Sequence, residues 1–273
     1  SRRKKRKGKQ GTSFVTFNGS TWTTLRGFLQ RTDVHVVMAQ ELKLDGQAKL
    51  AAEEWCQRHR WKPFITKCRR TELGNVSAGA GVYVRNHIGA APIEPFGIEI
   101  CGGWVAAVHV DYAMRGGIVC IAAYFETGTG YGPKTGNWQR LLRIGEYLRS
   151  VNRPFIIGGD WNEAAKVIDG AGWPGVVQGR FVQPEGPGTC RSAEGGWSTI
   201  DYFLVARHLK EAVTTVHTVK SERPIPHLPV QLNLNKTPRA YREGVLKKVK
   251  QFLFTVPYGP AATPPGLWTR RRC

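Results

Sequence analysis

The apolar positions of residues 14–235 fall into short runs bounded by polar residues, with helical spacing in a few places. Residues 34–40 (VHVVMAQ) are rich in valine and bounded by polar residues, which predicts a buried strand. The same pattern predicts further strands over residues 14–18, 61–67, 81–85, 103–111, 117–124, 155–160, 199–205, 213–219 and 228–234.

Helical periodicity is clearest over residues 137–151, where apolar residues recur at spacings of three and four. The apolar face consists of Trp138, Leu141, Leu142, Tyr147, Leu148 and Val151, and the opposite face of Arg140, Arg143, Glu146 and Arg149. The helix is expected to end before Pro154, because a residue that precedes proline disfavours helical conformation. Further helices are predicted over residues 45–59, around residues 25–29 and shortly after residue 160. Residues 170–197 are rich in Gly and Pro and are expected to be irregular.

Strands in meander order, some of them separated by helices, favour one sheet-rich α/β domain over residues 13–235. A hydrophobic fraction of 41% with nine tryptophans is ordinary for a folded chain and excludes wholesale disorder. No window reaches the roughly 18 uninterrupted apolar residues of a membrane span. The sequence has neither an initiator methionine nor the apolar segment of a signal peptide, so we expect a fragment of a longer chain.

The six cysteines lack the close pairing of a zinc ribbon or a CxxC redox site, and buried free thiols are expected instead.

The chain carries 40 Lys and Arg against 20 Asp and Glu, a net charge of +20, and most of this excess is terminal. Residues 1–10 hold seven cations and no acid, and residues 236–273 hold nine cations and one acid. The 24 cations and 19 acids that lie between them leave a net charge of only +5. We therefore expect a basic disordered arm over residues 1–12 and a basic, Pro-rich tail or linker over residues 236–273. A protein with this much positive charge is expected to bind a polyanionic partner, most often nucleic acid.

Polar residues at the ends of predicted strands are the best candidates for chemistry, since strand ends line the edge of a sheet while strand middles fill the core. Such positions are held by Asn18, Glu41, Tyr124, Asp160 with Asn162, and Asp201, and His227 lies in a Pro-rich turn before the last strand. Taken singly, each has an ordinary structural explanation, such as a helix cap for Asp160. The ordered set is what points to a catalytic site.

In the order of its motifs, the sequence resembles the endonuclease/exonuclease/phosphatase superfamily, the metal-dependent fold of DNase I-like nucleases and abasic-site endonucleases. The endonuclease domains that open non-LTR retroelement polyproteins are the most similar in style. The motifs are TFNGSTW (16–22), VVMAQELKL (36–44), SAGAGVYVR (77–85), IAAYFETG (121–128), PFIIGGDWN (154–162), GTC (188–190), STIDYFLV (198–205) and PHLPV (226–230). The resemblance covers residues 14–235.

This resemblance implies a two-sheet β-sandwich flanked by helices, the DNase I-like four-layer architecture, with the site at one edge. It implies that Glu41 is the principal ligand of Mg²⁺, with Mn²⁺ as an alternative, and that Asn18 orients the metal-bound shell. A hard cation that keeps several waters needs only one or two carboxylates. Asp160 and Asn162 would then position or deprotonate the attacking water.

The resemblance also implies that Asp201 holds His227 in one tautomer, and that His227 contacts the scissile phosphate or transfers a proton. Tyr124, Thr189 and Ser198 match positions that donate hydrogen bonds to the phosphate.

Two positions depart from the pattern of the superfamily. Ser20 stands where members often carry an acid two residues after the first Asn, and Pro226 stands where they usually carry Asp before the final His. Both missing acids are metal ligands in the pattern, which puts a second metal site in doubt.

The leading hypothesis is a Mg²⁺-dependent DNA endonuclease whose nick leaves a 3′-OH primer for a reverse transcriptase encoded further along a polyprotein. One alternative is a phosphatase that acts on a small or lipid phosphoester. The other is a nucleic-acid-binding module of the same fold with weakened catalysis. DNA is the expected partner, with the basic termini on its phosphate backbone, and the expected location is intracellular, in the nucleus.

Overall fold

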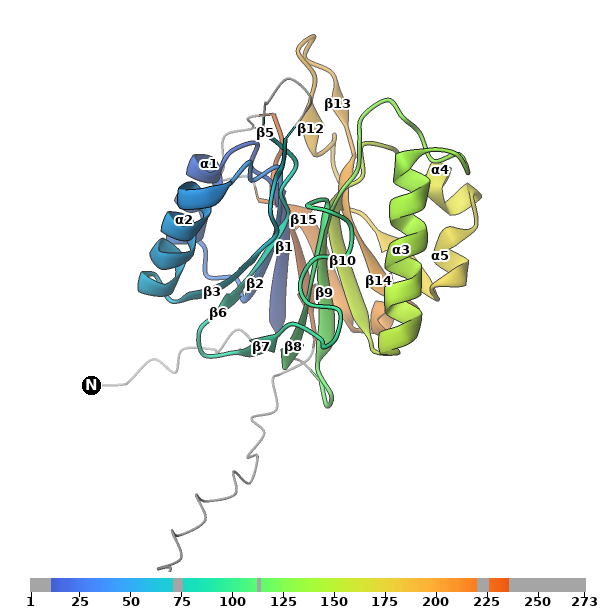
Figure 1. Cartoon of the computed structure of the whole chain (residues 1–273). Helices are drawn as coiled ribbons and strands as arrows, with labels where there is room; N and C mark the ends of the chain where they lie inside the picture. Colours follow the sequence, from blue (N-terminus) through green and yellow to red (C-terminus); the bar gives the residue numbers. More distant parts are fainter. Residues whose placement is uncertain (1–10, 71–75, 112–113, 220–225, 236–273) are drawn as a thin grey trace, which may run out of the picture. The chain divides into compact units, whose positions relative to one another are not determined.

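The computed structural model describes residues 11–70, 76–111, 114–219 and 226–235 (Figure 1). The predicted tail over residues 236–273 and residues 1–10 of the predicted arm lie outside these ranges. Thr12, which the sequence assigned to the arm, is the first residue of strand β1 and pairs with Leu234.

One six-stranded sheet has the order β15–β16–β1–β2–β6–β3. Its strands are β1 (Thr12–Asn18), β2 (Val36–Gln40), β3 (Trp61–Ile65), β6 (Gly81–Arg85), β15 (Val213–Thr218) and β16 (Val230–Leu234). Helices α1 (Trp22–Arg31) and α2 (Gly46–Arg58) cover its outer face (Figure 1).

The second six-stranded sheet has the order β11–β14–β10–β9–β8–β7. Its strands are β7 (Gly89–Ala91), β8 (Val105–Asp111), β9 (Ile118–Tyr124), β10 (Phe155–Asp160), β11 (Gly179–Val182) and β14 (Asp201–Ala206). Helices α3 (Gly136–Val151), α4 (Ala165–Gly170) and α5 (Trp173–Val176) lie on its outer face (Figure 1).

The remaining elements of the described residues are two small hairpins and one short helix. The hairpins pair β4 (Arg69–Arg70) with β5 (Val76–Ser77), and β12 (Cys190–Arg191) with β13 (Trp197–Ser198). The 3₁₀ helix η1 (Arg207–Ala212) joins β14 to β15. Among the residues described, no helix is long and apolar enough to cross a bilayer.

The two sheets pack face to face, and alternation along their strands builds the layers. In β2, Val36 and Met38 face the core shared with the second sheet, whereas Val37 and Ala39 face the core under α1 and α2. Because successive side chains of a strand point to opposite faces, a Val-rich run without polar alternation suits a strand that is covered on both sides. The predicted helix-flanked two-sheet sandwich is therefore confirmed.

Strand register brings the candidate residues to one edge. β1 runs parallel to β2, with Asn18 opposite Gln40, so Glu41 follows immediately at the same end. β9 runs parallel to β10, with Tyr124 opposite Asp160, and the antiparallel β14 places Asp201 opposite Asp160.

All ten predicted strands are present, with their ends within two residues of the prediction. The prediction of an irregular segment over residues 170–197 was wrong, because α5, β11 and β12 lie within it and β13 begins there. These elements are two to four residues long, too short for a periodic pattern, and β11 forms by pairing with the distant β14.

The predicted solvent face of α3 was wrong at Arg140, which is buried, and its predicted apolar face was wrong at Leu142, which is 41% exposed. Ile144 and Gly145 complete the buried face instead. Arg140 is buried because Glu126, in the loop after β9, lies 3.0 Å from its guanidinium. Helical spacing cannot show a charge partner supplied by another segment.

The five cysteines in the described part of the chain are free. Cys56 and Cys120 are buried, as predicted, whereas Cys68, Cys101 and Cys190 are only partly covered. Burial raises the pKa of the Cys56 thiol to about 12.

Candidate catalytic site at the edge of the two sheets

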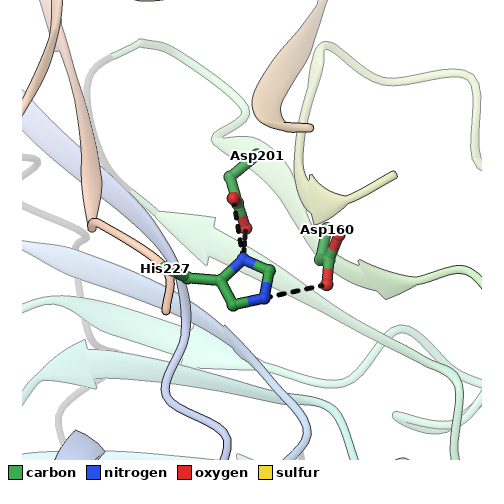
Figure 2. A group of neighbouring side chains, drawn as sticks. All are labelled: Asp160, Asp201 and His227. Atoms are coloured by element: carbon green, nitrogen blue, oxygen red, sulfur yellow. Dashed lines mark hydrogen bonds and ion pairs between the residues drawn. The ribbon is translucent and has the colours of Figure 1, made fainter. Parts of the chain in front are cut away.

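Six of the side chains predicted for the site meet at one edge of the sandwich. Asn18, Glu41 and Tyr124 form one connected group, and Asp160, Asp201 and His227 form another, which Figure 2 shows. The amide of Asn18 joins the two groups, because its nitrogen lies 3.2 Å from a Glu41 oxygen and 2.8 Å from an Asp160 oxygen.

Asp201 and His227 form a buried ion pair. Nδ1 of His227 lies 2.9 and 3.1 Å from the two carboxylate oxygens of Asp201. The carboxylate of Asp201 is fully buried. The backbone N–H of Asp201 donates to Oγ1 of Thr189 at 2.9 Å. Burial alone lowers the pKa of His227, but the charge and hydrogen bond of Asp201 raise it to about 11. The imidazole is thus held in one orientation and protonated at neutral pH.

Asp160 lies on the other side of the imidazole, with one oxygen 3.9 Å from Nε2 of His227 (Figure 2). Burial and the nearby charge of Asp201 raise its pKa to about 7, against the opposing effects of His227 and Asn18. A carboxylate with a pKa near neutrality can accept and release a proton at physiological pH.

Glu41 is fixed by two donors. The hydroxyl of Tyr124 donates to one carboxylate oxygen at 2.9 Å, and Asn18 donates to the other. Nζ of Lys43 lies 3.8 Å from the same carboxylate. Burial and the adjacent Glu41 raise the pKa of Tyr124, so the phenol remains a donor.

Asn162 shapes the turn that follows β10. Its backbone N–H donates to Asp160 at 3.1 Å, and its side-chain amide donates to the carbonyl of Phe125 at 2.8 Å. In this arrangement Asn162 fixes the orientation of Asp160 relative to the loop after β9.

Thr189 and Ser198 lie in the segment that frames this edge of the sheet. Thr189 is fully buried, and its hydroxyl accepts from the N–H groups of Ile200 and Asp201. Ser198 is exposed on β13, and its hydroxyl lies 3.5 Å from the carbonyl of Cys190. In this structure Thr189 supports the Asp201 backbone, and Ser198 is accessible to a ligand at the rim.

Two residues near the site were not predicted. Sγ of Cys190 lies 3.8 Å from Nε2 of His227, and Lys43 approaches Glu41. Both stand inside motifs that carried the resemblance, next to Thr189 and two residues after Glu41, so proximity in sequence is the signal that could have found them.

Ser20 and Pro226, the two departures from the pattern of the superfamily, use backbone atoms here. The N–H of Ser20 donates to the side-chain oxygen of Asn18 at 2.8 Å, which turns the amide nitrogen of Asn18 toward the carboxylates. The carbonyl of Pro226 accepts from the N–H of Arg191 at 3.0 Å, which fixes the backbone before His227.

The model of the Endonuclease/Exonuclease/phosphatase family matches residues 20–226. The chain belongs to this family. Family membership confirms the resemblance seen in the motifs, and no curated protein sequence matches the chain.

Three solved structures with a similar fold are nucleases. The endonuclease domain of TRAS1, a telomere-specific non-LTR retrotransposon, is 14% identical with a TM-score of 0.57, over 82% of this chain and 98% of that domain. The 3′-5′ exonuclease NExo from Neisseria meningitidis is 18% identical with a TM-score of 0.60, over 82% and 99%. The AP endonuclease LMAP from Leishmania major is 15% identical with a TM-score of 0.60, over 82% and 88%. At these identities the likeness shows that the fold is shared.

Members of this family typically depend on a divalent metal, and the donors present fit a hard cation. Asp160, Asp201 and His227 offer ligand atoms that all lie within 4.8 Å of one another. However, both oxygens of Asp201 and Nδ1 of His227 are already engaged with each other. The carboxylate of Glu41, which Tyr124 and Asn18 hold in place, is therefore the better oxygen donor for Mg²⁺ or Mn²⁺.

Proposed function

We propose that this protein is a Mg²⁺-dependent DNA endonuclease that hydrolyses one strand and leaves a 3′-OH. The observation that supports it is the meeting of Glu41, Asp160 and the Asp201–His227 pair at one edge of a fold shared with nucleases. The burial of charged groups of both signs costs free energy when the chain folds. Buried charged groups held by hydrogen bonds are typical of catalytic sites.

The chemistry divides among the residues by their charge. Asp160 takes a proton from the attacking water, because its raised pKa makes it a base near neutral pH. As the new O–P bond forms and the bond to the 3′ oxygen breaks, protonated His227 faces the negative charge of the phosphoryl group. The leaving 3′ oxygen takes its proton from solvent. A bound Mg²⁺ would supply charge stabilisation at the phosphate, and Glu41 would hold it.

The deciding experiment is the nicking of supercoiled plasmid in the presence of Mg²⁺, with end-labelling to identify the termini. Glu41→Ala and His227→Ala should each lower the nicking rate by about two orders of magnitude or more. The matched controls are Glu54→Ala on α2 and His208→Ala on η1, which remove exposed residues of the same types that lie outside the site. Nicking that survives both site substitutions would refute the assignment.

A catalytically weakened nucleic-acid-binding module is the second candidate, and Ser20 and Pro226 favour it. Neither side chain offers a carboxylate, so a metal held by Glu41 would have fewer acidic ligands. Salt-sensitive DNA binding without nicking in Mg²⁺ or Mn²⁺ would favour this candidate. Turnover of a small phosphomonoester without plasmid nicking would point to a phosphatase.

We propose further that the protein acts in the nucleus as part of a longer polyprotein that contains a reverse transcriptase. Seven cations within residues 1–10 support nuclear import, although phosphate contact would use the same residues. A fluorescent fusion of the full chain should concentrate in nuclei, and deletion of residues 1–10 should redistribute it to the cytoplasm.

A further inference from the structure

Arg140 is a buried cation that the proposed chemistry does not use. It lies on α3 with 7% of its surface exposed. Its guanidinium lies 3.0 Å from Glu126 and 2.5 Å from the side-chain oxygen of Asn137. Burial of a guanidinium is costly unless its charge and donors are satisfied, and these two partners satisfy part of that requirement.

The guanidinium also lies over an aromatic ring. Its central carbon is 3.8 Å from the ring centroid of Trp104, well within the range of a cation–π contact. Trp104 is itself buried, so solvent does not compete strongly for this contact.

Trp104 in turn stacks on Tyr124. The two ring centroids are 5.4 Å apart and the planes differ by 8°. The carbonyl of Trp104 also accepts from the backbone N–H of Tyr124 at 2.9 Å. Both the backbone and the ring of Tyr124 are therefore held by Trp104, which leaves the phenol little freedom to rotate away.

The hydroxyl of Tyr124 donates to Glu41 at 2.9 Å. A continuous series of contacts thus runs from Arg140 through Trp104 and Tyr124 to Glu41. Asn137 extends it to the loop after β9, since its amide donates to the carbonyl of Glu126 at 2.9 Å.

We propose that Arg140 is a positioning residue that acts through Trp104 and Tyr124 to fix the Glu41 carboxylate for the divalent metal. This inference rests on the proposed metal role of Glu41. Groups that orient a ligand matter because a carboxylate that is already fixed loses less freedom when the metal binds.

The test is a double-mutant cycle read by Mn²⁺ binding to the full chain, measured by isothermal titration and by electron paramagnetic resonance without DNA. Arg140→Met and Tyr124→Phe should each weaken Mn²⁺ affinity by about tenfold. The double variant should be little weaker than either single variant, because both changes loosen the same carboxylate. In plasmid nicking, excess Mg²⁺ should restore most of the kcat of Arg140→Met, with KM for DNA unchanged.

Arg143→Met is the matched control, since Arg143 is exposed on the same helix and pairs with Glu146 across the surface. It should bind Mn²⁺ as the unmodified chain does. If Arg140→Met does not fold, Arg140→Lys retains a cation for Glu126 but lacks the planar group over Trp104, and it should still weaken Mn²⁺ binding severalfold.

The results distinguish a failure of the positioning role of Arg140 from a failure of the metal role of Glu41. If Glu41→Gln weakens Mn²⁺ binding but folded Arg140 variants do not, or if Arg140→Met has its full effect in the Tyr124→Phe background, the positioning role is overturned. If Glu41→Gln itself leaves Mn²⁺ binding unchanged, the metal role of Glu41 fails, and the positioning role with it.

Discussion

Asp160 and Asp201 are register partners in the antiparallel pair β10–β14, so two buried carboxylates face one imidazole. Nδ1 of His227 lies 2.9 Å from Asp201, and Nε2 lies 3.9 Å from Asp160. The raised pKa values of Asp160 and His227 mean that the metal-free fold retains protons that the unfolded chain releases. Retained protons couple stability to pH.

The first prediction concerns the free energy of unfolding of the metal-free protein. The pKa of His227 rises from 6.5 to about 11 on folding, so its stabilising contribution is full below about pH 6.5 and is lost as the pH rises through 11. The stability advantage of the unmodified chain over His227→Gln should therefore shrink by roughly 1 kcal/mol or more between about pH 7 and pH 9. Urea unfolding in EDTA, followed by tryptophan fluorescence, measures this difference.

Asp160 affects the free energy of unfolding of the metal-free protein at lower pH than His227 does. Its pKa rises from 3.8 to about 7 on folding, so its contribution to stability falls as the pH rises between these values. His208→Gln, which replaces an exposed histidine on η1, is the matched control. A stability difference between the unmodified chain and His227→Gln that stays constant from pH 6 to pH 10 would contradict the protonated state of His227.

A second prediction concerns the charge and orientation of His227. In Asp201→Asn the amide keeps the shape of the carboxylate but loses its charge, so the pKa of His227 should fall toward its ordinary value. A titration of the imidazole by nuclear magnetic resonance should show this fall. The nicking rate should drop by roughly 100-fold or more, since a misoriented neutral imidazole cannot face the phosphate charge. An unchanged imidazole titration would show that Asp201 does not set the charge of His227.

The side chains that meet at this edge of the sandwich could be anticipated from sequence because strand ends have a local signature. Asn18 and Asp160 each follow a short apolar run, and parallel pairing then brings such ends together. Arg140 could not be anticipated, because its burial depends on Glu126 and Trp104, which come from other segments. The hairpin β12–β13 was missed for the related reason that two-residue strands carry no periodic signal.

The need for the two glycines of the GGD motif is also visible only in the three-dimensional structure. A Cβ at Gly158 would lie 2.8 Å from the Cβ of Thr16 across the sheets, and one at Gly159 would lie 2.9 Å from the carbonyl of Ala123. Gly158 allows β10 to approach β1 closely, whereas Gly159 leaves room for the neighbouring strand β9. The amide of Gln40 bridges the gap between the sheets by donating to the carbonyl of Gly158 at 3.2 Å.

The third prediction follows from this close approach. Gly158→Ala should lower the free energy of unfolding by about 1–3 kcal/mol, because the added methyl forces β1 and β10 apart. Gly170→Ala is the control, since a Cβ there meets nothing within 4 Å. Urea unfolding of the two variants tests the difference, and equal stabilities would show that the sheets separate without cost.

The last prediction is that DNA binding depends on the terminal segments, whereas the chemical step does not. The terminal segments 1–10 and 236–273 carry 16 of the 40 cations, whereas the site residues lie between residues 18 and 227 in a region of net charge only +5. Deletion of both segments should flatten the dependence of log affinity on log salt concentration by about 0.9 for each phosphate that these segments neutralise. The nicking rate at saturating DNA should stay within a few-fold of the full chain, because Glu41, Asp160 and His227 keep their partners.

Fluorescence anisotropy across a salt series measures the slope, and single-turnover nicking measures the chemical step. A truncated protein that binds with an unchanged slope, or that no longer nicks at saturating DNA, would show that the charge and the chemistry are not divided in this way.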